Sequence, residues 1–305
     1  MTIDINQLKE EGLEAFANQN YQQAISLLNE VYENERTFTN NQLFAKALKE
    51  NGQIDSALTI AQEYVGEYLG KKEDYQFYFD LCLAAGYFIM ARRMAMESIF
   101  TEDRDERLLQ IHEAEELAWE ERAADIQKTH RQFKHLAGYD VLTQQQIYQD
   151  AQTLPVEEFV DAANTVLLDP DCMPIIRVSI LTDIQCLELH RKVKYLYIDG
   201  KEYTTILCEQ PKPLRDDVYF EARDYLSETV GQEDPVANQM LQEQLRLEMN
   251  VLFPQLERVT DPIAWIQADI AMINGQRILN AHRESVEQAA IHDFTHRLLS
   301  EMGAL

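Results

Sequence analysis

Two histidines near the end of the chain have the spacing of a metal-binding pair. His292 and His296 lie four residues apart, so on a helix both imidazole rings would project from one face. Asp293 stands where a zinc protease carries its glutamate base, and only nine residues follow His296 to supply a third ligand. His282 would lie about 15 Å away along a helix. The sequence therefore predicts packing or surface histidines, and no metal is expected.

Other residue groups with chemical potential are incomplete. Segment 66–71 has one residue too few between its glycines for a phosphate-binding loop, and Lys72 stands where Ser or Thr would hold magnesium. Asp103 and Asp105 do not continue into a calcium loop, because Arg107 follows and the required glycine is missing. No local pattern links a serine or cysteine to a histidine base. We expect no catalytic residue and no cofactor, and an enzyme is disfavoured.

The composition limits the classes of partner. The 305 residues carry 27 basic and 53 acidic side chains, a net charge of −26, whereas nucleic acids and anionic membranes require a basic face. No apolar run is long enough to span a membrane, and the N-terminus lacks the pattern of a signal peptide. The cysteines have no paired spacing, which favours reduced thiols and a cytoplasmic protein; they are Cys82, Cys172, Cys186 and Cys208.

Residues 1–100 contain a pattern that occurs three times. It is centred on Ala24, Ala57 and Ala91, which lie 33 and 34 residues apart. Gly52 and Gly86 precede the second and third alanine by five residues. Apolar residues occur three positions before and four positions after each alanine: Tyr21, Ile54, Phe88, Leu28, Ala61 and Ala95. A period near 34 residues is typical of stacked helix-turn-helix units.

Each unit predicts two helices joined by a tight turn. The first helix should end near Asn18, Gly52 or Gly86, where the turn needs a residue that tolerates a left-handed backbone. The alanine should lie where the two helices cross closely. Because neither helix buries its apolar face alone, the units must stack on one another.

These residues resemble the tetratricopeptide repeat family. Gly12 with Tyr21, Ala24 and Leu28 fits the family pattern best, and the other two units are looser. The resemblance implies a superhelix in which the first helix of each unit lines a concave groove. The groove candidates that it implies are Lys9, Leu13, Phe16, Gln42, Lys46, Lys49, Gln76 and Asp80.

The same resemblance suggests what the groove binds. One subgroup of the family holds the C-terminal carboxylate of chaperones with Lys, Asn and Arg, and only Lys9 matches that set; Leu13, Glu73 and Phe77 do not. A helix or an extended segment with apolar anchors is a more suitable partner. We therefore expect a scaffold or adaptor that binds another protein or a peptide. The alternative is a cytoplasmic peptide-sensing regulator without a DNA-binding domain.

Residues 101–150 predict a long acidic linking helix. An apolar stripe through Trp119, Ile126 and Phe133 favours one helix over about 103–136. Such a helix would cap the exposed end of the third unit. A homodimer seam through residues 103–137 is the alternative.

Residues 151–305 predict a helical domain with one β-hairpin. Asp-Pro pairs at 234–235 and 261–262 indicate helix starts, and a last helix is expected over about 278–302. The helix that begins at residue 262 should bury an isoleucine stripe. Residues 192–208 are rich in β-formers around Asp199-Gly200, which predicts a type I′ turn with Leu196 opposite Tyr203 and Val193 opposite Ile206. This layout resembles tetratricopeptide-containing proteins of low-GC Gram-positive bacteria, which have no assigned reaction.

Overall fold

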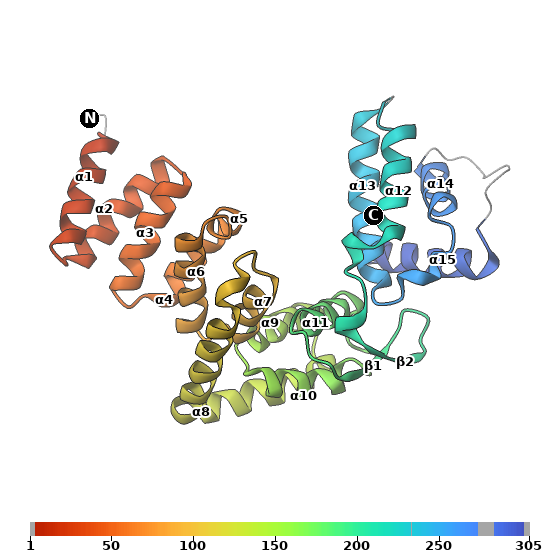
Figure 1. Cartoon of the computed structure of the whole chain (residues 1–305), viewed down its shortest axis with the longest axis horizontal. Helices are drawn as coiled ribbons and strands as arrows, with labels where there is room; N and C mark the ends of the chain where they lie inside the picture. Colours follow the sequence, from red (N-terminus) through yellow and green to blue (C-terminus); the bar gives the residue numbers. More distant parts are fainter. Residues whose placement is uncertain (1–3, 233, 274–283, 302–305) are drawn as a thin grey trace. The chain divides into compact units, whose positions relative to one another are not determined.

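The computed structural model describes residues 4–232, 234–273 and 284–301 (Figure 1). These residues form fifteen α-helices and one antiparallel two-stranded sheet, so the predicted mainly α fold with a single hairpin is confirmed. The chain divides into two compact units. The N-terminal unit comprises Met1–Lys128 and Asp150–Val156, and the C-terminal unit comprises Thr129–Gln149 and Glu157–Leu305.

The N-terminal unit is built from paired helices, as predicted. Consecutive helices α1 to α4 contact one another, α4 contacts α6, and α6 contacts α7. The helices are α1 (Ile5–Ala17), α2 (Tyr21–Asn34), α3 (Phe38–Glu50), α4 (Ile54–Gln62), α5 (Val65–Tyr68), α6 (Lys72–Ala84) and α7 (Phe88–Glu97).

The turns inside the three pairs α1–α2, α3–α4 and α6–α7 have the same geometry. Gly52 and Gly86 have φ angles of +76° and +75°, as expected for residues that end the first helix of a pair. In the first pair the left-handed residue is Gln19, with φ of +59°, whereas Asn18 has an ordinary φ of −83°. The predicted helix end near Asn18 is therefore confirmed, since α1 ends at Ala17, but the left-handed residue is the next one, Gln19. All three left-handed residues donate a backbone hydrogen bond to the carbonyl three residues earlier, at 2.9–3.0 Å.

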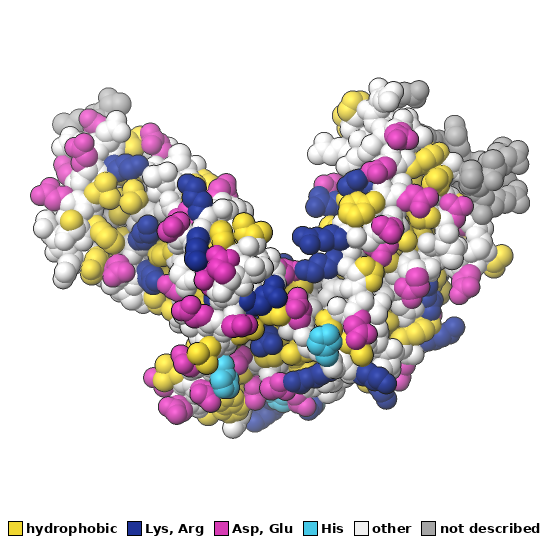
Figure 2. Space-filling view, in the orientation of Figure 1, with side chains coloured by type: hydrophobic (Ala, Val, Ile, Leu, Met, Phe, Trp, Pro, Cys, Tyr) yellow, Lys and Arg dark blue, Asp and Glu magenta, His cyan; other side chains and the backbone are white. Residues whose placement is uncertain are grey.

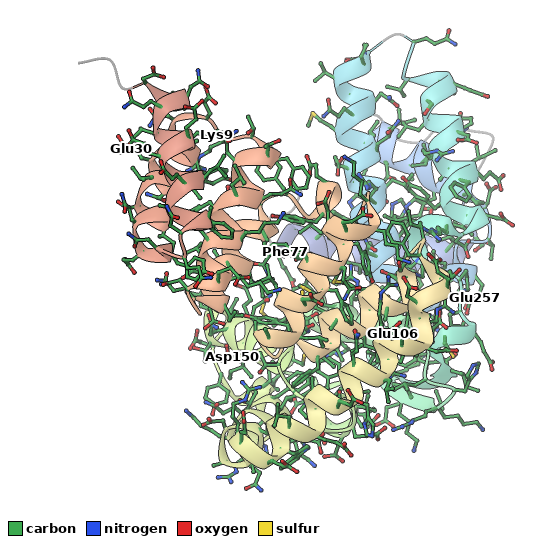
Figure 3. All side chains as sticks on the ribbon, turned by 60° about the vertical axis from the view of Figure 1, so that its left-hand side comes forward. Lys9, Glu30, Phe77, Glu106, Asp150 and Glu257 are labelled. Atoms are coloured by element: carbon green, nitrogen blue, oxygen red, sulfur yellow. The ribbon has the colours of Figure 1, made fainter. Side chains whose placement is uncertain are left out.

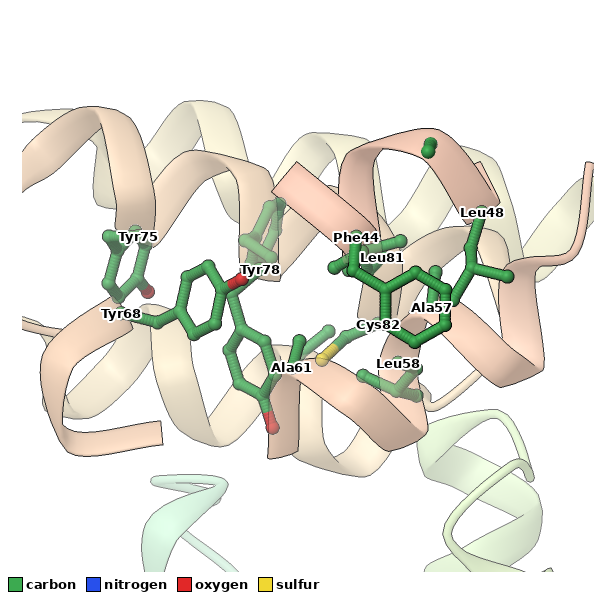
Figure 4. Packing of buried hydrophobic residues seen from close by; sticks show 14 of the residues in the cluster. Phe44, Leu48, Ala57, Leu58, Ala61, Tyr68, Tyr75, Tyr78, Leu81 and Cys82 are labelled. Carbon is green, nitrogen blue, oxygen red and sulfur yellow. The ribbon is translucent and has the colours of Figure 1, made fainter. Parts of the chain in front are cut away.

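The three predicted crossing alanines are completely buried. Ala24, Ala57 and Ala91 each have 0% exposure, and they belong to one continuous apolar core that extends to Ile111. Figure 4 shows part of this core, in which Ala57 and Ala61 lie among larger side chains. At Gly12 even a methyl group would lie 3.0 Å from Leu28, so α1 and α2 also approach closely there.

The long helix α8 (Arg104–Lys134) is interrupted. Arg122 has non-helical backbone angles, φ −132° and ψ 29°, where the sequence predicted one continuous helix. Ile111 belongs to the core of the N-terminal unit, and the Arg107 guanidinium lies 4.4 Å from the Tyr75 ring centroid, so this part of α8 packs against α6. Phe133 instead stacks on Phe159, with 5.2 Å between ring centroids. Two different stripes of α8 are thus buried within the chain.

The helices of the C-terminal unit begin as the sequence predicted. Asp234 Oδ1 accepts hydrogen bonds from the amides of Val236 and Ala237, and Asp261 Oδ1 accepts one from Ala264. Both ends of the predicted 278–302 helix lie outside the described residues, as does His282. The elements are α9 (Val141–Ala151, which continues into the N-terminal unit), α10 (Val156–Val166), α11 (Pro174–Cys186), β1 (Lys192–Leu196), β2 (Glu202–Ile206), α12 (Asp217–Thr229), α13 (Pro235–Leu252), α14 (Pro262–Ile273) and α15 (Val286–Glu301).

The hairpin forms where expected but in a register shifted by one residue. Tyr195 pairs with Tyr203 and Leu196 pairs with Glu202, so the predicted pairs Leu196–Tyr203 and Val193–Ile206 were wrong. A type I′ turn needs positive φ at both central residues, and only Gly200 has it, at +74°. The amide of Tyr197 donates to the Lys201 carbonyl at 2.9 Å, which leaves three residues in the loop. A three-residue loop with a left-handed glycine shifts the pairing by one.

The hairpin is supported by the end of α13 and the segment that follows it. The Tyr197 hydroxyl donates to the Leu252 carbonyl at 3.1 Å, and Gln255 donates to the Tyr195 hydroxyl at 2.7 Å. Arg258 forms an ion pair with Asp199 at 3.1 Å and lies over the Tyr197 ring. Two strands alone are only marginally stable, so these contacts are needed to hold them.

Candidate functional site

Two groups of residues in the structure have functional potential, one in each unit. The first is the surface carried by α1, α3 and α6, here called the first-helix face. Figure 3 labels Lys9 on α1 and Phe77 on α6. Lys9 Nζ donates to Asn40 Oδ1 at 2.8 Å, which links α1 to α3.

Side chains of α3 and α6 interlock along this face. The Lys49 and Lys46 ammonium groups lie 5.2 and 5.8 Å from the Phe77 ring centroid, within the range of cation–π attraction. Lys49 also approaches Asp80 at 3.7 Å, and Gln76 donates to Asp80 at 2.8 Å. Gln42 likewise donates to Asp74. The structure therefore brings five predicted groove residues together: Gln42, Lys46, Lys49, Gln76 and Asp80.

The two apolar groove candidates on α1 differ in accessibility. Leu13 is 39% exposed. Phe16 is half-buried, packs against the core and meets Tyr21 edge to face at 5.6 Å between centroids. Leu13 can therefore contact a partner directly, whereas Phe16 mainly supports the α1–α2 pair.

An apolar cavity of about 490 Å³ is a separate feature of the N-terminal unit. Met90 and Met94 of α7 contribute to its wall, together with Val65 and Leu69. Leu69 is 37% exposed and Ile99 is 75% exposed, so the cavity has an apolar rim. Cavities of this size accept small molecules or single side chains.

The second group is a buried cluster in the C-terminal unit, formed by α13, α14 and α15 (Figure 1). Each helix contributes two polar or aromatic residues four positions apart, which places both on one side of that helix. The central members, here called the α13–α15 cluster, are Glu248, Asp269, His292 and His296. Their exposed fractions are 0%, 1%, 2% and 17%.

Asp269 lies at the centre of the α13–α15 cluster. Its Oδ1 is 2.9 Å from His292 Nε2 and 2.8 Å from His296 Nε2. Glu248 Oε1 lies 3.3 Å from His296 Nε2. One nitrogen or oxygen atom from each of the four side chains lies within 4.8 Å of the corresponding atoms of the others.

A second layer of contacts orients these side chains. His292 Nδ1 faces Glu284 Oε1 at 2.9 Å, and the Trp265 indole N–H donates to Glu248 Oε2 at 2.7 Å. The Trp265 ring also stacks on the His292 ring at 3.8 Å between centroids. Gln244 donates to Glu248 at 2.8 Å. The ring and carboxylate orientations are therefore fixed from outside the cluster.

The electrostatics follow from this burial. Burial alone lowers the pKa of His292, but hydrogen bonds to Asp269 and Glu284 outweigh it and raise the pKa to about 10. Hydrogen bonds to Asp269 and Glu248 likewise outweigh burial and raise the pKa of His296 to about 9. Burial and the nearby charge of Asp269 raise the pKa of Glu248. The nearby carboxylates thus favour the charged form of both imidazoles.

The sequence indicates the histidine pair but not its partners. Few residues follow His296, and Glu248 and Asp269 come instead from two earlier helices. Of the predicted isoleucine stripe of α14, Ile266 is buried but Ile263 is half-buried, and Trp265 and Asp269 share the buried side. The available signal was Glu248 itself, which lies within the otherwise apolar stripe of Leu241, Leu245 and Leu252.

Comparison with family models, curated proteins and solved structures gave no match to this chain. Among the described residues, no helix combines the length and the apolar character that a membrane span requires.

Proposed function

We propose that the chain is a non-catalytic interaction protein that binds a segment of another protein through the first-helix face. The observation that carries this proposal is the continuity of the face from Lys9 and Leu13 on α1 to Asp80 on α6. Its side chains come from the first helix of each pair. Three helix pairs with matching turns support membership of the tetratricopeptide class, in which these helices line the binding groove.

The chemistry of the face indicates the kind of partner. Lys46 and Lys49 lie over Phe77 and Lys49 pairs with Asp80, so neither lysine is arranged as a clamp for a terminal carboxylate. Figure 2 shows hydrophobic, basic and acidic side chains interspersed on the visible surface of the N-terminal unit. Exposed Leu13 supplies an apolar contact. A helix or extended segment with apolar anchors fits this mixture, and the net charge of −26 favours a basic segment.

The proposal is tested by co-purification from a cytoplasmic extract, followed by binding measurements with the purified partner. Leu13→Asp should weaken binding by about 2 kcal/mol, because it places a charge where an apolar contact is buried. Lys46→Glu should have a smaller effect that decreases as salt is raised, since charges at the margin mainly set association rates.

Lys128→Glu is the matched control for Lys46→Glu. It makes the same charge change at an exposed position on α8, outside the first-helix face. The partner should remain bound to this variant with unchanged affinity. Equal losses in Lys46→Glu and Lys128→Glu, or full binding by Leu13→Asp, would refute the first-helix face as the site.

A second candidate function is supported by the apolar cavity. A peptide-sensing regulator needs a pocket for an apolar side chain, and the cavity beside Met90 and Met94 has a suitable volume. In that case a short apolar peptide should bind the isolated protein. Leu69→Asp at the cavity rim should abolish that binding, whereas Leu13→Asp should not.

A further inference from the structure

The α13–α15 cluster takes no part in the proposed partner binding, yet its side chains are buried and converge. Acidic side chains are rarely fully buried unless they are paired or hold a metal. Among the described residues, neither Glu248 nor Asp269 forms an ion pair with a lysine or arginine. The two imidazoles are the only cationic groups with which they pair in that part of the chain.

The donor atoms match the ligands of a transition metal. Imidazole nitrogen with carboxylate oxygen is a common zinc ligand set, and a structural zinc site has four protein ligands in a tetrahedron. Calcium and magnesium prefer oxygen ligands alone. Two nitrogens and two carboxylates therefore favour Zn²⁺.

The outer contacts have the form that metal-bound histidines require. A ligating imidazole presents one nitrogen to the ion and donates the other N–H to a carboxylate or carbonyl. His292 presents Nε2 to the centre of the cluster and Nδ1 to Glu284. Glu248 keeps Oε1 toward the centre because Oε2 accepts the Trp265 N–H.

The distances allow an ion after a small rearrangement. Tetrahedral ligands at about 2.05 Å from zinc lie roughly 3.3 Å from one another. Glu248 Oε1 and His296 Nε2 already have that separation. The two Asp269–histidine distances, 2.9 and 2.8 Å, are shorter by a few tenths of an ångström. The other separations among the four ligand atoms are at most 4.8 Å, so cation entry requires an outward movement of Asp269 and a closer approach of the more distant ligand atoms.

We propose that the α13–α15 cluster is a metal site that binds one Zn²⁺ ion and joins α13, α14 and α15. With four protein ligands the coordination shell is complete, so the ion has a structural role. It cross-links three helices that are separated in sequence. Zinc binding should therefore stabilise the C-terminal unit.

The primary experiment measures zinc in the purified full-length protein by mass spectrometry of the metal, after dialysis against metal-free buffer. We expect about one zinc per chain, and at least tenfold weaker binding in His296→Gln. His296 is the most exposed member of the cluster, so this substitution should perturb the fold least. His112→Gln is the matched control, because His112 also lies four residues from a partner, Glu116, but both are exposed.

A conservative variant outside the ligand set tests the outer contacts. Trp265→Phe keeps the ring against His292 but removes the N–H that holds Glu248. Loss of such a contact typically weakens metal binding about 10–100-fold. Trp119→Phe replaces the other tryptophan and should leave zinc binding unchanged.

The spectrum of the wild-type protein loaded with Co²⁺ gives a test that needs no variant. Co²⁺ in a four-coordinate nitrogen and oxygen site absorbs visible light strongly, whereas surface-bound octahedral Co²⁺ absorbs weakly. The double variant Cys208→Ser/His190→Gln serves as a control. It removes a thiol and an imidazole near the surface, whose Sγ and Nδ1 atoms lie 3.6 Å apart. Zinc and the Co²⁺ spectrum should persist in this background.

Three results would overturn the proposal. The first is a wild-type protein without stoichiometric zinc that also binds no added Zn²⁺. The second is zinc that is retained equally by folded His296→Gln and Trp265→Phe. The third is loss of all zinc in the Cys208→Ser/His190→Gln background, which would assign the metal to the surface.

Discussion

At the scale of single residues, Gln19 adopts a left-handed backbone conformation that glycine occupies at the equivalent position of the other two turns. Its φ of +59° corresponds to +76° at Gly52 and +75° at Gly86. An L-residue in this region costs roughly 1–2 kcal/mol, whereas glycine pays about 0.5–1 kcal/mol in lost conformational freedom. The first turn is therefore the least favourable of the three.

Gln19→Gly should raise the free energy of unfolding by up to about 1 kcal/mol. Asn18→Gly, one position earlier at φ of −83°, should only lower it. Gly52→Ala should lower it by about 1 kcal/mol through the backbone alone, because nothing lies within 4 Å of the added methyl group. Urea denaturation of the three variants measures these differences. Stabilisation by Asn18→Gly rather than Gln19→Gly would contradict the assignment of the turn.

The sequence could predict some individual site residues but not their assembly. The spacing of His292 and His296 reveals that they share a helical face, because the α-helix has a known period. It contains no information on which residues of α13 and α14 lie opposite. Glu248 and Asp269 approach the pair only after three helices pack, and that packing depends on apolar shape. The candidates on α3 and α6 have related positions in the sequence, since Gln42 and Gln76 are 34 residues apart, as are Lys46 and Asp80.

At the scale of elements, close helix crossings explain the small residues of the N-terminal unit. Ala57→Leu should lower the free energy of unfolding by about 1–3 kcal/mol, because three extra carbons must fit a completely buried position. Ser56→Leu adds the same side chain at the adjacent exposed position of α4 and should change it little. Denaturant midpoints give the comparison. Equal midpoints for Ala57→Leu and the wild type would show that α4 does not pack closely at this residue.

The hairpin shows which features local sequence rules predict and which they do not. Asp199-Gly200 located the turn correctly, because these residues accept tight backbone conformations. The length of the loop depends on contacts outside the turn. Tyr195 and Tyr197 must both be buried, and Arg258 must reach Asp199. These long-range contacts select a three-residue loop. Strand positions were therefore predictable, whereas the register was not.

At the scale of the whole molecule, the two units have separate cores. The core of the N-terminal unit runs from Ala15 to Ile111, and the C-terminal unit has its own buried residues around Trp265. Units with separate cores often unfold as separate transitions. The division lies within α8, after Lys128, and Asp150–Val156 also belongs to the N-terminal unit.

Calorimetry of the full chain should therefore show two unfolding transitions. Ala57→Leu should lower the midpoint of one transition by about 4 °C or more, because it perturbs only the N-terminal core. Added Zn²⁺ should raise the midpoint of only the other transition, that of the C-terminal unit. Parallel shifts of a single transition in both experiments would show that the chain unfolds as one cooperative unit.

The ring stacking in the C-terminal unit has an optical consequence. The chain has two tryptophans, and Trp265 lies against His292 at 3.8 Å with its rings nearly parallel. An excited indole transfers an electron to an adjacent imidazolium more readily than to an imidazole whose charge is shared with a metal. The emission of Trp265 should therefore be weak while His292 is an imidazolium and stronger once His292 binds a metal ion. Trp265 is thus an intrinsic fluorophore with which to test whether added Zn²⁺ enters the α13–α15 cluster.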